Sequence, residues 1–181
     1  MIPVTVQAFI SAPREDLFDF IADLSLRPAW CDHFMKDFRL AHPDTRGKGA
    51  GARFLLEAPG FRHYVETTIV EADRPRRIVE SLHGGRNGYS SGEMVWELSR
   101  QGSGLTRVEV TFAWEPVMPR ERLKEMLGSR RWTRRQLKTA LERLRVIFEE
   151  RPEGELARAT IAGYEVLRAP RFGVSPKVVR G

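Results

Sequence analysis

Two stretches decide the fold class of this chain: Glu93-Met94-Val95-Trp96-Glu97-Leu98 and Arg107-Val108-Glu109-Val110-Thr111-Phe112-Ala113-Trp114. In both, large apolar residues stand at every second position, so an extended chain gathers them on one face. Gly102-Ser103-Gly104 lies between the stretches and is typical of a turn. The two stretches therefore predict a β-hairpin with one face turned toward the core.

Further strands with the same period precede this hairpin. We expect them at residues 2–10, 34–40, 52–57, 62–72 and 77–83. The period does not fix which face of strand 62–72 is buried, because both Tyr64 with Glu66 and Val65 with Thr67 make a plausible inner face.

Apolar residues recur at helical spacing in two regions, after the first strand and after the last. Residues 13–24 and 25–30 predict two short helices directly after the first strand. A long helix is expected from Arg120 to the region before Pro152, with a break at Gly128-Ser129, and one further short helix is expected within 155–167. The long helix carries an apolar stripe of Trp132, Leu137, Leu141, Leu144 and Phe148. Such a stripe must pack on an apolar surface, so we expect this helix to lie across the sheet.

Composition favours one globular domain in the cytoplasm. Hydrophobic residues make up 41% of the chain and charged residues 30%, which argues against disorder. Cys31 is the single cysteine and cannot form an internal disulfide. We find neither a signal sequence nor an apolar run of membrane-spanning length. A domain over residues 1–150 and an extension over 151–181 are expected, and a homodimer is compatible with the sequence.

The positive charge is concentrated in the C-terminal third. Residues 1–118 have a net charge of −2 and residues 119–181 a net charge of +8. The cations Arg131, Arg134, Arg135 and Lys138 lie on the expected long helix, but glutamates follow them on the same helix. This pattern favours a solvated helix face, so no nucleic-acid partner is expected. Binding of an acidic partner through this helix remains the alternative.

The order of strand, two short helices, six strands and long helix resembles the START and birch-pollen-allergen-like (SRPBCC) superfamily, in its polyketide cyclase/dehydrase-like branch. The resemblance covers about residues 2–150. It rests on Ser11-Ala12-Pro13, Leu17-Phe18-Asp19-Phe20-Ile21-Ala22-Asp23, Trp30, the Gly47-x-Gly49-x-Gly51 turn, Glu71-Ala72-Asp73-Arg74-Pro75-Arg76-Arg77-Ile78, Gly92-Glu93-Met94-Val95-Trp96-Glu97-Leu98 and Gly104-Leu105-Thr106-Arg107-Val108.

This resemblance implies an α+β helix-grip fold, in which a curved seven-stranded antiparallel sheet wraps around the long C-terminal helix. It also implies an internal cavity for a small hydrophobic ligand, which is an aromatic, polyketide or lipid-like molecule. The family does not imply one chemistry. Cyclisation or dehydration of a polyketide-like substrate and non-catalytic transport of a lipid or quinone both fit.

Aromatic and polar residues on the expected strands and helix are the candidates for the site. Large apolar rings with methionines make an adaptable wall, and a few polar groups orient the ligand. The candidate ligand-binding residues are Phe54, Tyr64, Met94, Trp96, Phe112, Trp114, Met118, Trp132 and Gln136. A cyclase also needs a hydrogen-bond donor near the ligand oxygen, for which we consider Arg86 or Tyr89, and a base near the carbon acid, for which we consider His83 or Glu66.

Other chemistries find no support in the sequence. The histidines lack the spacing of metal ligands, and no metal or other cofactor is expected. The glycine-rich turn at 47–51 leads into a strand, so it lacks the helix N-terminus of a phosphate loop. Cys31 has no partner base in its sequence neighbourhood and is expected to be a buried thiol.

Overall fold

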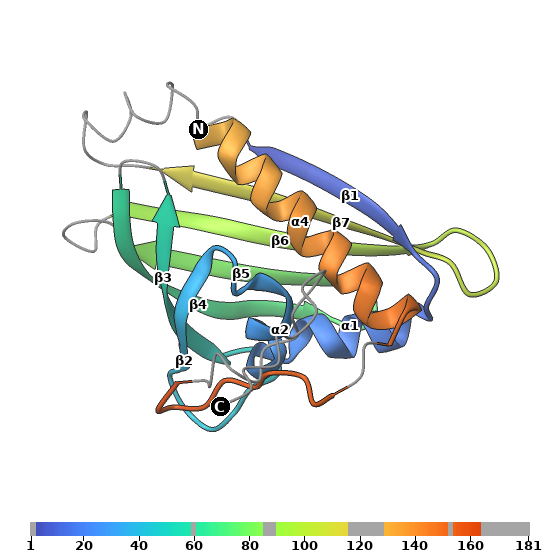
Figure 1. The fold of residues 1–181 in the computed structure, drawn as a ribbon, viewed down its shortest axis with the longest axis horizontal. Coiled ribbons are helices and arrows are strands. Elements are labelled where there is room, and N and C mark those ends of the chain that lie inside the picture. The colour runs from blue at the N-terminus through green and yellow to red at the C-terminus, as the bar shows by residue number, and fades with distance from the viewer. Residues whose placement is uncertain (1–2, 59–60, 85–89, 116–128, 152–153, 164–181) are drawn as a thin grey trace, which may run out of the picture.

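A computed structural model describes residues 3–58, 61–84, 90–115, 129–151 and 154–163. Its elements follow the expected order (Figure 1): β1 (Val4–Ile10), α1 (Arg14–Ala22), a 3-10 helix η1 (Leu24–Leu26), α2 (Pro28–Cys31), β2 (Met35–Leu40), β3 (Gly51–Ala58), β4 (Phe61–Asp73), β5 (Arg77–Gly84), β6 (Ser90–Arg100), β7 (Thr106–Glu115) and α4 (Arg130–Glu149).

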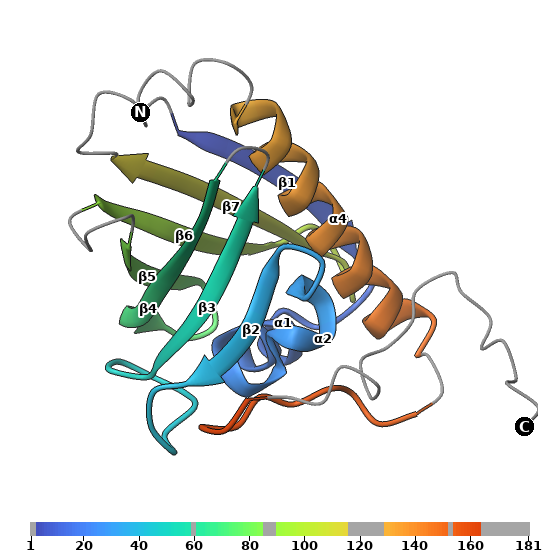
Figure 2. The ribbon, with the colours of Figure 1, turned by 60° about the vertical axis from the view of Figure 1, so that its left-hand side comes forward.

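The strands form one antiparallel sheet of seven strands in the order β1-β7-β6-β5-β4-β3-β2. The sheet curves around α4, which crosses its concave face beside β1 (Figures 1 and 2). This arrangement is the predicted helix-grip fold. The expected hairpin is β6 and β7, where Met94 pairs with Phe112 and Trp96 pairs with Val110.

The structure decides the phase of β4. Val65 and Thr67 are buried on the concave side, and Val65 pairs with the buried Phe54 of β3. Tyr64 and Glu66 alternate with them and are exposed on the outer side. The interior therefore receives an aliphatic residue and a hydroxyl from this strand.

The long helix follows its predicted stripe. Its buried residues are Leu137, Ala140, Leu141, Leu144 and Ile147, which face the sheet, α1 and α2. The described helix begins at Arg130, next to the expected break at Gly128-Ser129, while residues 120–128 lie outside the described part of the chain. No helix in the described part is both long and apolar enough to cross a membrane.

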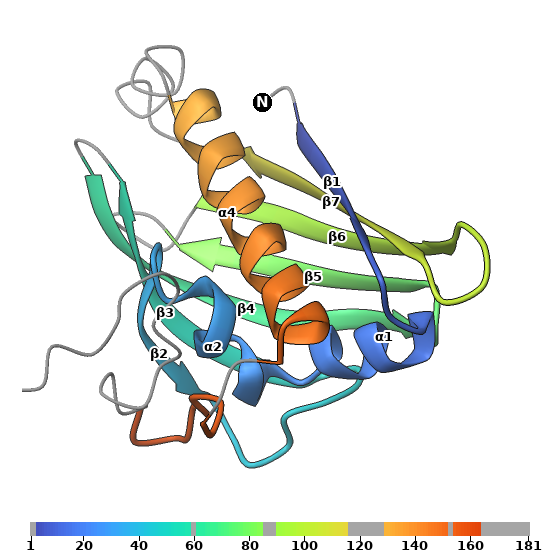
Figure 3. The ribbon, with the colours of Figure 1, turned by 45° about the vertical axis from the view of Figure 1, so that its right-hand side comes forward.

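The short helices pack at one end of the grip, next to the C-terminal half of α4 (Figure 3). Phe20 of α1 meets Phe148 of α4 in an edge contact, with ring centroids 5.2 Å apart. The helix expected over 13–24 ends at Ala22, because Asp23 is extended and caps η1 instead. Every residue from Ile21 to Trp30 is buried, so this end of the grip is closed by packed side chains.

Residues 154–163 lie along the edge strand β2 and do not form the helix expected within 155–167; the rest of that range is outside the described residues. Leu40 N donates to Thr160 O (3.0 Å), and Ala159 N donates to Ser25 O (2.7 Å). These two hydrogen bonds hold the segment against β2 and η1 in an irregular conformation, and its one β-bridge is internal, between Thr160 and Gly163.

Asp23 joins η1 to the loop before β3. It is 3% exposed and accepts hydrogen bonds from Ser25 Oγ (2.6 Å) and Arg46 Nη2 (2.8 Å). Burial raises the pKa of Asp23, but the hydrogen bonds from Ser25 and Arg46 outweigh this effect and leave the pKa below its ordinary value.

The depressed pKa of Asp23 makes the fold sensitive to acid. A group with a lowered folded-state pKa stabilises the fold above its unfolded pKa, about 3.9, and loses this effect as the pH falls through the folded value. We expect Asp23→Asn to lower the free energy of unfolding by about 1–3 kcal/mol at pH 7. In urea unfolding, the difference in free energy of unfolding between the unaltered protein and this variant should narrow as the pH approaches 3. Asp44→Asn, at an exposed position of the loop before β3, is the control. A difference in stability that stays constant with pH would contradict the depressed pKa of Asp23.

Candidate functional site

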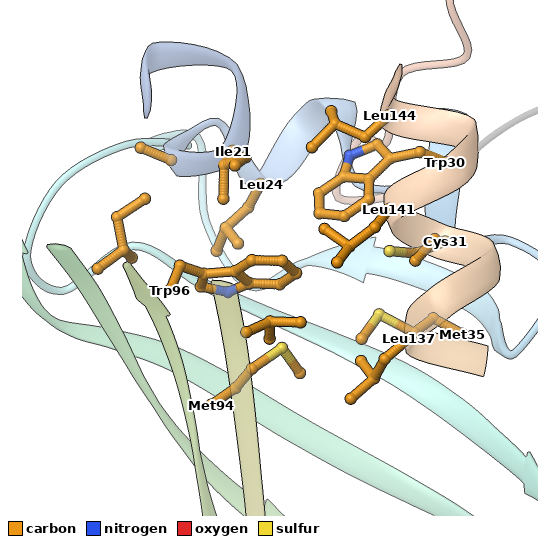
Figure 4. Packing of buried hydrophobic residues seen from close by; sticks show 14 of the residues in the cluster. Ile21, Leu24, Trp30, Cys31, Met35, Met94, Trp96, Leu137, Leu141 and Leu144 are labelled. Carbon is orange, nitrogen blue, oxygen red and sulfur yellow. The ribbon is translucent and has the colours of Figure 1, made fainter. Parts of the chain in front are cut away.

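The concave face of the sheet and the inner face of α4 enclose an apolar interior. Phe54, Met94 and Trp96 are 3%, 1% and 1% exposed and lie on this face, as predicted from their strands. Figure 4 shows Met94 and Trp96 opposite Leu137 and Leu141 of α4. Near the short helices, this interior is closely packed.

The opposite end of the interior is less completely covered. Phe112 and Trp114 lie near the end of β7, and Trp132 lies in the first turn of α4. All three are only partly buried, although they pack against the core. Phe112 and Trp114 are parallel, with ring centroids 6.4 Å apart, and Trp132 makes an edge contact with Phe34 at 6.4 Å. Partly exposed rings therefore mark the end of the grip where β7 ends and α4 begins.

Gly92 leaves room for one of these rings. It pairs with Trp114 on β7 and with the buried Leu82 on β5, which places it on the concave face. A Cβ atom at Gly92 would lie 2.6 Å from Cε3 of Trp114 and 2.5 Å from the Ala113 carbonyl oxygen. The glycine thus lets the indole ring lie directly over β6.

A buried ion pair lies between the short-helix segment and the concave face of the sheet. Arg27 and Glu80 are 0% and 1% exposed, and Nη2 of Arg27 donates to Oε1 of Glu80 at 2.6 Å. Trp96 Nε1 donates to the same oxygen at 2.8 Å, and Thr67 Oγ1 donates to Oε2 at 2.9 Å. Nη2 of Arg27 also donates to the Ile21 carbonyl oxygen at 3.3 Å. This network ties the short-helix segment to β4, β5 and β6.

Aromatic rings complete the environment of the arginine. The guanidinium carbon of Arg27 lies 5.1 Å from the ring centroid of Trp30 and 5.2 Å from that of Trp96. Both distances allow a cation–π interaction, which is strongest where water is excluded. The two rings also contact each other edge to face, with centroids 5.3 Å apart.

Sequence analysis did not identify this pair. Arg27 was part of a short helical segment with no assigned role, and Glu80 was one residue of a strand. A signal was present nonetheless, because Glu80 occupies the inward phase of β5 between Ile78 and Leu82. A charge at an inward position requires a partner, since a lone buried carboxylate is very costly.

Two of the four candidate catalytic residues, Glu66 and His83, lie outside the interior. Glu66 and His83 face each other across β4 and β5, but both are exposed on the outer side of the sheet. The interpretation of these two as interior bases is therefore not supported by their position, because the β4 and β5 phases point them outward. Arg86 and Tyr89 lie outside the described residues.

The remaining ligand-binding candidates are Tyr64, Gln136 and Met118. Tyr64 is 45% exposed on the outer side, where its hydroxyl donates to Asp37 Oδ2 at 3.3 Å and Arg53 covers its ring. Gln136 is half-buried on α4, and its backbone carbonyl oxygen, not its side chain, lies 3.0 Å from Nε2 of His33. Met118 is outside the described part of the chain.

Two titratable groups near α2 are unsuited to proton transfer at neutral pH. Burial lowers the pKa of His33 to about 4, although its hydrogen bond to the Gln136 carbonyl acts in the opposite direction. A carbonyl can only accept, so Nε2 carries the proton of the neutral ring. Burial raises the pKa of the Cys31 thiol, which agrees with its expected role as a buried, unreactive residue. Among the described residues, no cluster of side chains is arranged to hold a metal ion.

Comparison with known families agrees with this architecture. The profile of the polyketide cyclase / dehydrase and lipid transport family matches residues 1–149. The chain belongs to this family. It thereby falls within the START/SRPBCC superfamily, as the sequence resemblance implied.

Solved structures of several other proteins share this fold at low sequence identity. A START superfamily protein from Mycobacterium smegmatis is 20% identical, with a TM-score of 0.58 over 77% of this chain and 94% of the other. TTHA0849 from Thermus thermophilus is 17% identical, with a TM-score of 0.60 over 83% and 99%. Major latex-like protein 151 from Panax ginseng is 10% identical, with a TM-score of 0.56 over 81% and 97%. None of the curated proteins matches the sequence.

The buried pair predicts a large difference between removing one partner and replacing both. Glu80→Ala leaves Arg27 charged and unpaired, so we expect the free energy of unfolding to fall by about 3–5 kcal/mol. Arg27→Met with Glu80→Gln removes both charges and keeps an acceptor for Trp96, so this double variant should recover most of the loss.

Denaturant unfolding of the purified variants measures both effects. Glu93→Ala on β6 is the matched control, because Glu93 is exposed and its removal should change stability by less than about 0.5 kcal/mol. Equal losses for Glu80→Ala and Glu93→Ala would show that the fold does not depend on the buried pair.

Proposed function

We propose that this protein binds a small, largely apolar molecule, aromatic or acyl-chain in nature, between the curved sheet and α4. The single observation that carries this proposal is the set of inward-facing but partly exposed rings of Phe112, Trp114 and Trp132. Rings that served only as core would be expected to be covered, as Trp30 and Trp96 are at 0% and 1% exposure. Flat rings at the end of an apolar interior offer a ligand a broad surface.

The charges of the interior support an uncharged or weakly polar ligand body. Arg27 and Glu80 neutralise each other, and His33 is neutral near pH 7. The surrounding surface comes from Phe54, Met94 and the leucines of α4. Such a surface gains free energy from apolar contact and has no net charge with which to hold a free ion. The family description, which joins polyketide cyclisation and dehydration with lipid transport, names ligands of this kind.

Binding without chemistry is favoured over catalysis by the described interior. A cyclase needs a donor and a base at the bound poly-carbonyl chain. Glu66 and His83 point away from the interior, and Glu80 is fully engaged by Arg27, Trp96 and Thr67. The alternative of polyketide cyclisation or dehydration therefore depends on Arg86 or Tyr89. Loss of turnover on changing Arg86 or Tyr89 would establish a cyclase, and binding with no turnover would establish a carrier.

Trp114 provides the test of ligand binding. We expect Trp114→Ala to weaken binding of an aromatic or acyl-chain ligand about tenfold, because ring contact contributes on the order of 1 kcal/mol in addition to buried area. Calorimetric titration with quinones, aromatic polyketides, sterols and fatty acids measures the affinities. Tyr64→Ala removes an exposed ring from the outer face and should leave them unchanged. If no member of the panel binds the unaltered protein, the proposal fails.

The basic face of α4 favours a second candidate function, which is association with an acidic partner. Arg131, Arg134, Arg135 and Lys138 are exposed, and none of them forms an ion pair with a described residue. The first turn of α4 carries no acidic residue, although the positive end of the helix dipole favours one there. The cations thus crowd the end of the helix that tolerates them least. An open groove on α4 is lined by these four residues together with Thr139, Glu142, Arg143 and Val146.

This face should give weak, salt-dependent binding rather than sequence-specific recognition. We expect retention on a polyanionic column to disappear by about physiological ionic strength, because exposed charges are screened there. Arg134→Glu with Arg135→Glu should abolish the retention at low salt. Arg76→Glu with Arg77→Glu, which changes the same number of exposed charges at the turn before β5 and the start of β5, should reduce it much less. Salt-resistant, sequence-dependent binding of nucleic acid would overturn this expectation.

A further inference from the structure

The N-terminal half of α4 carries a group of exposed cations that we call the basic face. It consists of Arg131, Arg134, Arg135 and Lys138. None of these four forms an ion pair with a described residue. In the C-terminal half the cations are paired, because Arg145 meets Glu142 at 2.9 Å and Arg143 meets Asp32. The charge of this helix is therefore balanced at one end and unbalanced at the other.

Partly exposed aromatic rings lie at the same end of the molecule as the basic face. Trp132 is in the first turn of α4, three residues before Arg135, and residues at this spacing are neighbours on a helix surface. Phe112 and Trp114 lie near the end of β7, which comes close to the beginning of α4 (Figures 1 and 3). Helix side chains tilt toward the N-terminus, so the cations also point toward this end.

An anionic bilayer offers both interactions that this end of the molecule can make. Its headgroups attract Lys and Arg, and a cluster of about four to eight such residues on an amphipathic helix is typical of binding to anionic lipid. Its interface also favours tryptophan, because the ring makes apolar contact while the indole N–H stays near water. An acidic protein surface would match the cations but would give the rings no apolar phase to enter.

Nucleic acid fits this end of the molecule less well. The basic face spans residues 131–138, about 10 Å of helix, and Glu142 and Glu149 are exposed beyond it. A phosphate backbone that followed the helix would therefore meet carboxylates. Single strands are held by bases that stack on open ring faces, whereas Trp132 is partly covered by its edge contact with Phe34. A bilayer that meets the molecule end-on encounters neither obstacle.

We propose that this protein docks on anionic membranes through the basic face and Trp132, with the end at which α4 begins turned toward the bilayer. This inference rests on the second candidate function, association with an acidic partner, and specifies that partner. Residues 1–118 have a net charge of −2, so the rest of the fold does not compete for the bilayer. Each cation near an anionic surface contributes about a fivefold gain in partitioning, so four cations place half-binding at roughly millimolar lipid.

Vesicle co-sedimentation tests the docking at physiological ionic strength. Vesicles of equal parts phosphatidylglycerol and phosphatidylcholine supply the anionic bilayer, and vesicles of phosphatidylcholine alone supply a neutral one. We expect partitioning onto the anionic vesicles to exceed partitioning onto the neutral ones by about a hundredfold or more. Equal binding to both kinds of vesicle would show that the cations do not carry the interaction and would overturn the proposal.

A matched pair of double variants locates the cations that bind. Arg134→Gln with Arg135→Gln removes two positive charges from the basic face, so partitioning onto anionic vesicles should fall about 25-fold. Arg76→Gln with Arg77→Gln removes the same charge at the start of β5. That position is at the opposite end of the sheet from the end of β7, because β5 and β7 run in the same direction. Charges so far from the bilayer are screened, so this control should change partitioning by less than about twofold. Equal falls for the two variants would reject the basic face as the docking surface.

Quenching of tryptophan fluorescence tests the contribution of the rings. Phospholipid brominated close to the headgroup quenches an indole that enters the interface. Trp30 and Trp96 are 0% and 1% exposed, so quenching reports on Trp114 and Trp132. We expect the bound protein to be quenched and Trp132→Phe, which keeps a ring against Phe34, to lose most of this effect. Bound protein without quenching, or quenching that persists in full in Trp132→Phe, would contradict docking through Trp132.

A polyanionic column separates this inference from the function on which it rests. If the protein is retained at low salt but binds neither kind of vesicle, the acidic partner is a protein or nucleic acid. The bilayer is then rejected, and the second candidate function stands. If the protein binds neither the column nor the vesicles, both fail together.

Discussion

The burial of Glu80 beneath Arg27 is the constraint around which this fold is organised. A carboxylate on the inward phase of a central strand is tolerated only if a cation and hydrogen-bond donors surround it. Arg27 supplies the cation from the segment between α1 and α2, and Trp96 and Thr67 supply donors from the two adjacent strands. The position of the short helices on the sheet is thereby fixed by chemistry as well as by shape.

The two ends of the grip differ in how completely their side chains are buried. The end held by the ion pair is filled by Trp30, Trp96 and the leucines of α4, whereas the end beyond Gly92 presents Phe112 and Trp114 as partly exposed rings. Apolar association has little directionality, so rings alone would accept a ligand in either orientation.

Much of this architecture could be predicted from the sequence, and the failures have physical causes. The alternation in β6 and β7 and the stripe on α4 depend only on burial, which local periodicity reports directly. The phase of β4 could not be fixed because a strand with Thr67 inside and Tyr64 outside has apolar character on both faces. Arg27 and Glu80 were missed because they are 53 residues apart, and pairing at that separation leaves no local pattern. The short helix expected within 155–167 is not found in the described part of that range, because the hydrogen bonds of Ala159 and Thr160 to η1 and β2 are likewise long-range contacts.

The ion pair occupies a position where apolar side chains would stabilise the fold equally well. The N–H groups of Arg27 that have no partner among the described residues are relevant to this choice. Buried pairs seldom stabilise a fold more than well-packed hydrophobic residues of the same volume. A methionine and a leucine in place of Arg27 and Glu80 would hold the short helices against the sheet without any desolvation penalty. Those residues would, however, remove the hydrogen bonds that now join the short-helix segment to β5. The charge of Arg27 is neutralised by Glu80 and its ring contacts are satisfied by Trp30 and Trp96, so the N–H groups of Nε and Nη1 are the part of this network that packing and charge balance leave unexplained. These N–H groups are fully buried between the short helices and the sheet.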